Sequence, residues 1–303
     1  MEENKEEKTK KHGKGLAKFR IGLYSTLADG LNKMYNTDRD YPEVLHQKDI
    51  YYGEDKFCTY DIYSKPNLVE PRPTIFYIHG GGFVAGDKKY YHHICKDFAL
   101  KDYIVVNINY RLAPSVRIKQ QVEDCNNALL HACSRIGKID FSNCYLCGDS
   151  AGAALLGMLL TQWQNKSLKK PAKLKIKATA LLYGLFDGSK LKGLLKRYLD
   201  APYHYSGEGT IEEFYDEFAV LKNVTKSFPP SIIFSSESDF IGEQSLAFID
   251  RLKELNVPHE YVIFKKGITT THGYMNMKDT VPYKKTMDAL IKFFKKHEKT
   301  PKA

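Results

Sequence analysis

The sequence predicts an α/β protein whose central sheet is antiparallel at one edge and parallel elsewhere. From residue 48 onward, short apolar segments alternate with segments of helical periodicity. The first two expected strands alternate apolar and polar residues, whereas the later ones are continuous apolar runs, as in strands buried on both faces. Because no Pro-, Gly- or Ser-rich linker divides the 303 residues, we expect one large domain.

The expected elements follow the apolar periodicity along the chain. The expected strands are Lys48–Tyr52, Phe57–Tyr63, Thr74–Ile78, Tyr103–Asn109, Asn143–Cys147, Ile176–Tyr183, Ser231–Ser235 and Glu260–Phe264. The expected helices are Tyr91–Lys101, Ile118–Arg135, Ala151–Asn165, Glu243–Leu255 and Pro282–His297. This alternation of strands and helices is typical of a parallel sheet covered by helices.

The N-terminal part of the chain precedes this alternation. Residues 1–12 carry charges of mixed sign and are expected to be a disordered tail, and residues 13–45 are expected to form a helical cap segment. Within that segment a set of apolar residues recurs at helical spacing: Leu16, Phe19, Leu23, Leu27, Leu31 and Met34. We expect the helix to pack on the domain, while the basic residues Lys14, Lys18 and Arg20 leave contact with a membrane surface open.

Residues 188–228 interrupt the alternation between one buried strand and the next. An insertion of this size in an α/β fold is commonly a lid over the site. We expect this insertion, together with the helix at 14–35, to cap the site, to shape an apolar pocket and to set acyl preference without taking part in the chemistry. The expected pocket residues are Phe83, Tyr198, Tyr203, Phe214 and Tyr215, although packing of the insertion on the domain would explain its aromatic residues equally well.

The charge and composition of the chain indicate which binding partners and which cellular compartment to expect. The net charge is +10, but the densest lysine clusters lie at residues 5–18 and 292–302 and no nucleic-acid-binding motif is present, so we expect no nucleic-acid partner. The N-terminus lacks the apolar region of a secretory signal, and no run approaches the roughly 18 apolar residues of a membrane span. Six cysteines in a chain of this length suggest a reduced, cytoplasmic protein. Cys144 and Cys147 lie on one expected strand and should face opposite sides of the sheet.

A serine lies at the bend between an expected strand and an expected helix. Residues 148–152 read Gly-Asp-Ser-Ala-Gly, and the small residues around Ser150 permit a strained turn that exposes its hydroxyl. Upstream, residues 79–83 read His-Gly-Gly-Gly-Phe, and such a glycine loop can turn backbone N–H groups toward a developing oxyanion. His79 is expected to brace this loop. The two motifs in this order indicate serine-dependent acyl transfer.

A nucleophilic serine needs a base, and the base needs an orienting carboxylate. His272 lies in the polar loop after the last expected strand, where it can reach over the edge of the sheet, and is the expected base. Three acids are candidates for the carboxylate, namely Asp187, Glu237 and Asp239. We favour Asp239, because it lies beyond the end of the penultimate strand and fits the chain order Ser, Asp, His.

Together these segments resemble the hormone-sensitive-lipase-like branch of the α/β hydrolases, which includes many bacterial carboxylesterases. The matching stretches are His79–Gly82, Asn109–Pro114, Gly148–Gly152, Glu237–Asp239 and His272–Gly273. The resemblance covers about residues 45–297 and implies an α/β-hydrolase fold, with an eight-stranded, mostly parallel sheet and a helical cap. On this basis residues 46–298 form the hydrolase domain, and residues 13–45 and 188–228 form the cap.

The resemblance also implies the roles of individual residues. Ser150, Asp239 and His272 would form the catalytic triad. The backbone N–H groups of Gly81, Gly82 and Ala151 would form the oxyanion hole, with His79 and Gly80 supporting the loop. The chain departs from the family pattern at Ser115, Ala153 and Phe240, and these departures bear on the shape of the acyl and alcohol pockets.

The expected function is that of a serine carboxylesterase that hydrolyses short- to medium-chain acyl esters through an acyl-serine intermediate. We expect a small-molecule ester as partner and neither a metal nor an organic cofactor. An amidase or deacetylase would use the same triad, and a receptor-like binding protein would use the same fold without catalysis. The sequence leaves a homodimer open.

Overall fold

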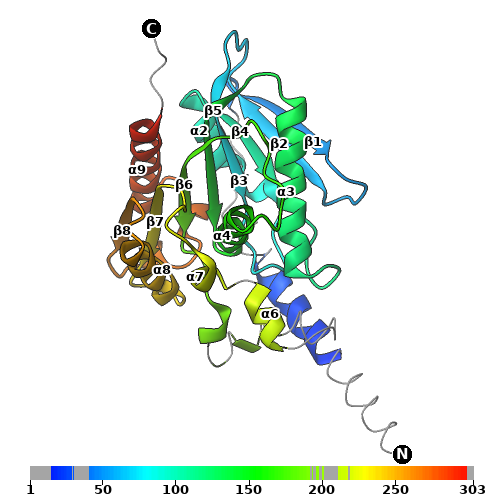
Figure 1. The fold of residues 1–303 in the computed structure, drawn as a ribbon, viewed down its shortest axis with the longest axis vertical. Coiled ribbons are helices and arrows are strands. Elements are labelled where there is room, and N and C mark those ends of the chain that lie inside the picture. The colour runs from blue at the N-terminus through cyan, green and yellow to red at the C-terminus, as the bar shows by residue number, and fades with distance from the viewer. Residues whose placement is uncertain are drawn as a thin grey trace, which may run out of the picture.

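The computed structural model describes residues 15–28, 30, 41–191, 193, 196–197, 200, 211–217 and 219–298 (Figure 1). The expected disordered tail at 1–12 lies outside the described residues. Four of the apolar and aromatic residues singled out above also lie outside them, namely Leu31, Met34, Tyr198 and Tyr203.

Eight strands form one sheet in the order β1-β2-β4-β3-β5-β6-β7-β8. Their bounds are β1 Leu45–Tyr51, β2 Thr59–Ser64, β3 Arg72–Ile78, β4 Ile104–Ile108, β5 Ile139–Asp149, β6 Ile176–Leu182, β7 Ser231–Ser236 and β8 His259–Phe264. The pairs β1–β2 and β2–β4 are antiparallel, and every later pair is parallel. The carboxyl ends of the parallel strands therefore meet at one edge, where ligands bind in open α/β sheets.

Helices cover both faces of this sheet (Figure 1). The helices α3 (Ile118–Arg135), α4 (Ala151–Gln164) and α8 (Gly242–Glu254) share one apolar cluster with alternate strand residues such as Phe76 and Leu146. The helices α2 (His92–Leu100) and α9 (Val281–His297) share a second cluster with the intervening residues. The remaining helical segments are α6 (Ile211–Glu217), α7 (Val220–Asn223) and the short turns η1 (Lys88–Tyr91), η2 (Gly188–Lys190), η3 (Ile268–Thr270) and η4 (Tyr274–Asn276).

The fold class expected from the sequence is confirmed. Helix α3 has the expected bounds. Helices α4 and α9 differ from the expected ones by one residue at one end, and α2 and α8 differ by one residue at both ends. Strand β5 is longer than expected at both ends, because Ile139–Ser142 precede the continuous apolar run and Gly148 and Asp149 follow it. Cys144 lies in the cluster beneath α3 and α4, and Cys147 lies in the cluster beneath α2 and α9, so the two thiols face opposite sides of the sheet as expected.

The N-terminal helix, residues 15–28, packs on the domain through a different face from the one expected. Ala17 and Ile21 are buried, whereas the four described members of the expected stripe are 42–67% exposed: Leu16, Phe19, Leu23 and Leu27. Ala17 and Ile21 cluster with Val84 and Ala113 of two loops at the carboxyl edge of the sheet. Periodicity reveals an apolar stripe on a helix, but the fit between the helix and its neighbours decides which stripe packs. The short Ala17 side chain permits the helix to approach the domain closely. Among the described helices, none is long and apolar enough to cross a membrane.

Candidate active site

Ser150 stands between the end of β5 and the start of α4. Its backbone has φ 50° and ψ −119°, a conformation that costs energy for a residue with a Cβ atom and recurs at functional sites. The turn is held by a hydrogen bond from the Ser150 N–H to the carbonyl of Leu182, at 2.8 Å. Gly152 is required here, because a Cβ on it would lie 2.1 Å from the carbonyl oxygen of Ile78. The turn thus exposes the Ser150 hydroxyl at the carboxyl edge of the sheet.

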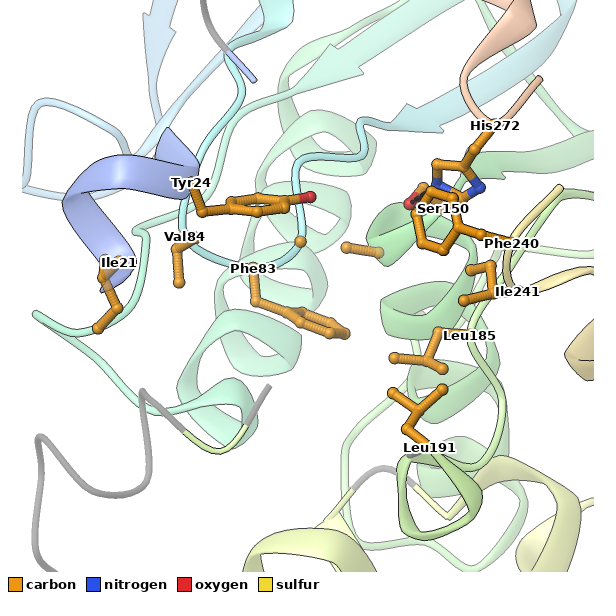
Figure 2. Close-up of a pocket in the computed structure, with 12 residues that line it drawn as sticks. Ile21, Tyr24, Phe83, Val84, Ser150, Leu185, Leu191, Phe240, Ile241 and His272 are labelled. Carbon is orange, nitrogen blue, oxygen red and sulfur yellow. Dashed lines mark hydrogen bonds between the residues drawn. The ribbon is translucent and has the colours of Figure 1, made fainter. Parts of the chain in front are cut away.

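His272 reaches this hydroxyl from the loop between η3 and η4 (Figure 2). Its Nε2 lies 2.8 Å from Ser150 Oγ, and its Nδ1 lies 2.9 Å from Asp239 Oδ1. The Asp239 side chain is only 2% exposed and also accepts a hydrogen bond from the Ile241 N–H. A proton on Nδ1 is therefore held by the carboxylate, which leaves Nε2 free to accept the serine proton. The rings of Tyr183 and Phe240 pack against the imidazole, with centroid separations of 5.1 and 4.7 Å.

The other two candidate acids lie in different environments. The Asp187 carboxylate caps η2, where it accepts from the Ser189 N–H at 3.1 Å. Glu237 is exposed and pairs with Lys265 at 2.8 Å, and that hydrogen bond lowers the pKa of the Glu237 carboxyl. The tertiary structure therefore brings Asp239 to His272, as the chain order indicated, and leaves Asp187 and Glu237 in local contacts.

The glycine loop after β3 has the left-handed backbone that its residues permit. Gly81 has φ 128° and Gly82 has φ 60°, and a Cβ on Gly81 would lie 2.0 Å from the carbonyl oxygen of Ala85. His79 is buried beneath the loop and stacks on Tyr110 with ring centroids 4.5 Å apart, while the Tyr110 hydroxyl donates to the His79 carbonyl. Burial lowers the pKa of His79, so this imidazole is neutral and serves as a packed support.

A second motif residue, Asp149, holds the same loop from below. Its buried carboxylate accepts hydrogen bonds from the Gly80 N–H at 2.9 Å, from Tyr77 at 3.1 Å and from Tyr91 at 3.2 Å. Burial raises the pKa of Asp149 to about 6, although these hydrogen bonds oppose the shift. This role of Asp149 could not be predicted from the sequence, because its partners Tyr77, Gly80 and Tyr91 come from distant segments of the chain.

The loop after β4 braces the glycine loop from the other side. The Ala113 N–H and the Gln121 side chain both donate to the carbonyl of Phe83, at 2.9 and 2.7 Å. Arg111 is fixed in turn by the carboxylate of Asp124, which accepts from Nε at 2.8 Å and from a terminal guanidinium nitrogen at 2.6 Å. These contacts explain why the stretch Asn109–Pro114 after β4 belongs, with the glycine loop, to the stretches that match the family.

A small cavity adjoins Ser150 (Figure 2). Its volume is about 70 Å³, several times the roughly 10–15 Å³ that a single buried water needs. The described residues that line it are Ile21, Tyr24, Gly82, Phe83, Val84, Ser150, Ala151, Leu185, Leu191, Phe240, Ile241 and His272. The lining is largely apolar and comes from the N-terminal helix, the glycine loop, the segment after β6 and the segment before α8.

The structure describes the side chains of two of the five expected pocket residues. Phe83 lines the cavity. Tyr215 does not belong to its lining, because the Tyr215 ring packs against the large core cluster and its hydroxyl contacts Lys196 and Asp200. The side chain of Phe214 lies outside the described part of the structure, as do Tyr198 and Tyr203. Tyr24 and Leu191 also line the cavity, although neither was expected there, because no local pattern shows which residues of the N-terminal helix and of the insertion face the site.

Among the described residues, one group has the spacing of a metal site. The ligand atoms of His46, Asp61 and His92 lie within 4.8 Å of one another. Asp61 is already paired, with His46 Nε2 and Lys88 Nζ each 2.8 Å from one of its oxygens. Burial alone would raise the pKa of Asp61, but hydrogen bonds from His46 and Lys88 lower it to about 2. Because Lys88 supplies the positive charge and would repel a cation, we interpret the group as an ion-pair network.

Comparison with known proteins places this geometry in a family. The model of a family with the α/β-hydrolase fold matches residues 75–276, which is more than half of the chain. The chain therefore belongs to this α/β-hydrolase family, in agreement with the resemblance indicated by the motifs. A crystal structure of esterase B from Lactobacillus rhamnosis, inhibited by a tributyrin phosphonate, has a TM-score of 0.82 at 20% identity and covers 93% of this chain and 95% of that chain. At this identity the similarity shows the shared fold.

Curated relatives have low but extended identity. A probable isoprenylcysteine α-carbonyl methylesterase of Arabidopsis thaliana is 24% identical over 246 residues, covering 76% of this chain and 52% of that protein. An acetyl esterase of Salmonella paratyphi A is 28% identical over 258 residues, covering 78% of this chain and 77% of that protein. The chain thus spans about half the length of the plant relatives it matches.

Proposed function

We propose that this protein is a serine carboxylesterase that hydrolyses short- to medium-chain acyl esters through an acyl-serine intermediate. The observation that carries the proposal is the pair of hydrogen bonds that links Ser150 to His272 at 2.8 Å and His272 to Asp239 at 2.9 Å, at the wall of an apolar cavity. Relatives named as an acetyl esterase and as methylesterases support an ester substrate.

In the first half of the reaction, His272 Nε2 takes the proton of Ser150 as Oγ attacks the ester carbonyl carbon. Asp239 holds the imidazole in the required tautomer and stabilises the imidazolium that forms. The carbonyl oxygen becomes an oxyanion, for which the donors are the backbone N–H groups of Gly81, Gly82 and Ala151. Ala151 is the first residue of α4, so its N–H has no partner within the helix and lies at the positive end of the helix dipole.

The tetrahedral intermediate then collapses. The bond from the carbonyl carbon to the alkoxy oxygen breaks, and His272 gives its proton to the leaving alcohol, which leaves the acyl group on Ser150. In the second half, His272 activates a water that attacks the acyl-serine, and the acid product leaves with the serine proton restored. A carbonyl oxygen at Gly81 and Gly82 places the acyl group among the apolar lining, and a cavity of about 70 Å³ favours acyl chains of a few carbons.

The test is the Ser150→Ala variant, assayed with a series of p-nitrophenyl esters from acetate to decanoate. We expect kcat to fall by roughly 10⁴–10⁶, as for the loss of a triad nucleophile. Ser134→Ala is a matched control, because Ser134 lies on the exposed end of α3 and bonds only locally. Ser150→Ala activity within tenfold of the wild type would disprove the assignment. A p-nitroanilide series on the same protein separates the ester preference from the amidase alternative.

A further inference from the structure

The N-terminal helix brings a polar side chain to the candidate active site. Ala17 and Ile21 anchor the helix on Val84 and Ala113, and Tyr24 packs against the same cluster one turn further along. Tyr24 lines the cavity together with Ser150 and His272. The helix is therefore part of the wall of the site as well as a cover over it.

Tyr24 lies directly against the glycine loop. A Cβ atom on Gly82 would lie 2.6 Å from the Tyr24 hydroxyl oxygen and 2.7 Å from two ring carbons. Only a glycine at position 82 leaves room for this ring. Figure 2 shows the hydroxyl end of the ring pointing across the cavity toward Ser150, with the glycine loop below it. The hydroxyl thus lies beside the residue whose N–H we assign to the oxyanion.

The chemistry of the lining makes this hydroxyl distinctive. Apart from Ser150 and His272, Tyr24 is the described lining residue with a polar side-chain group, and the other side chains are apolar. A single polar group in an apolar pocket fixes the orientation of a bound ligand. Burial raises the pKa of Tyr24, so the phenol keeps its proton at neutral pH and can act as a hydrogen-bond donor.

We propose that the Tyr24 O–H donates a hydrogen bond to the substrate carbonyl oxygen as it becomes the oxyanion, beside the N–H of Gly82. The proton stays on Tyr24, and no bond is made or broken at the phenol. The inference rests on the proposed esterase function and extends it, because the N-terminal helix then supplies a catalytic residue. It replaces the expectation that the cap takes no part in the chemistry.

The decisive variant is Tyr24→Phe, which removes the hydroxyl and keeps the ring. We expect kcat to fall about ten- to hundredfold for every acyl length, because one oxyanion donor is lost, with KM and the acyl-length profile unchanged. Tyr51→Phe is the matched control, since Tyr51 is exposed on the edge strand β1 and does not line the cavity. A second readout is the rate at which a small p-nitrophenyl phosphonate labels Ser150, which should slow by a similar factor.

Three outcomes decide the matter. A kcat of Tyr24→Phe within twofold of the wild type would overturn the inference while leaving the esterase proposal intact. The same holds if Tyr24→Ala changes the acyl-length profile while Tyr24→Phe retains full kcat, since Tyr24 would then be only a wall of the pocket. If the wild-type protein hydrolyses none of the esters, the proposed function itself fails. Circular dichroism melting curves establish that each variant is folded before its rates are compared.

Discussion

The buried carboxylate of Asp149 should make the stability of this protein fall as the pH rises through weakly acidic values. Burial raises the pKa of Asp149 from 3.8 to about 6 in the folded protein. Between these two values the folded protein binds a proton that the unfolded chain has released. The free energy of unfolding therefore decreases as the pH increases in this window, and it becomes independent of Asp149 above it.

The size of the effect follows from the two pKa values. The difference between these pKa values corresponds to about 3 kcal/mol in total. About 1 kcal/mol of this falls between pH 5 and pH 8, because the unfolded carboxyl is already mostly ionised at pH 5. The ionised carboxylate is tolerated at neutral pH because it accepts hydrogen bonds from Gly80, Tyr77 and Tyr91.

The assay is urea unfolding of the wild type and of Asp149→Asn at pH 5 and pH 8. The asparagine does not titrate, and the ionisable groups that do not interact with Asp149 cancel in the difference between the two proteins. We expect the free energy of unfolding of the wild type, relative to the variant, to fall by about 1 kcal/mol from pH 5 to pH 8. An unchanged difference between the two proteins would show that Asp149 does not titrate in this window, and a rising one would reverse the sign of the argument.

Two further predictions concern the triad acid and the pocket. Asp239→Asn should lower kcat for p-nitrophenyl acetate by about 10⁴, because the correct histidine tautomer is lost. Asp187→Asn and Glu237→Gln should keep a kcat within a few fold of the wild type. A severe defect in either of these two variants would contradict the assignment of the acid. Leu191→Ala should widen the cavity and move the optimum of the p-nitrophenyl ester series to longer acyl chains. Tyr215→Ala should leave this optimum unchanged, because Tyr215 lies outside the lining. A shift with Tyr215→Ala and none with Leu191→Ala would mean that the acyl group binds elsewhere.

Local patterns were sufficient to predict most of the fold. Apolar periodicity predicted the helices to within a residue, because each amphipathic helix such as α3 or α9 carries its packing face in its own sequence. Continuous apolar runs predicted the parallel strands for the same reason, since both faces of such strands are buried. The N-terminal helix is the exception, because it carries two apolar stripes and only the shape of its partners decides that Ala17 and Ile21 pack while Phe19 is exposed.

The contiguous parts of the candidate site could be predicted from their residue types alone. The turn at Ser150 and the glycine loop at Gly81 and Gly82 are short motifs whose residue types dictate the backbone, and their φ values follow from those residues. Chain order already favoured Asp239 as the partner of His272, and the structure brings the two together. The surroundings of Asp149, and the residue of the N-terminal helix that faces the cavity, could be seen only in the folded protein. These features depend on contacts between segments far apart in the chain, and no local pattern records where such segments meet.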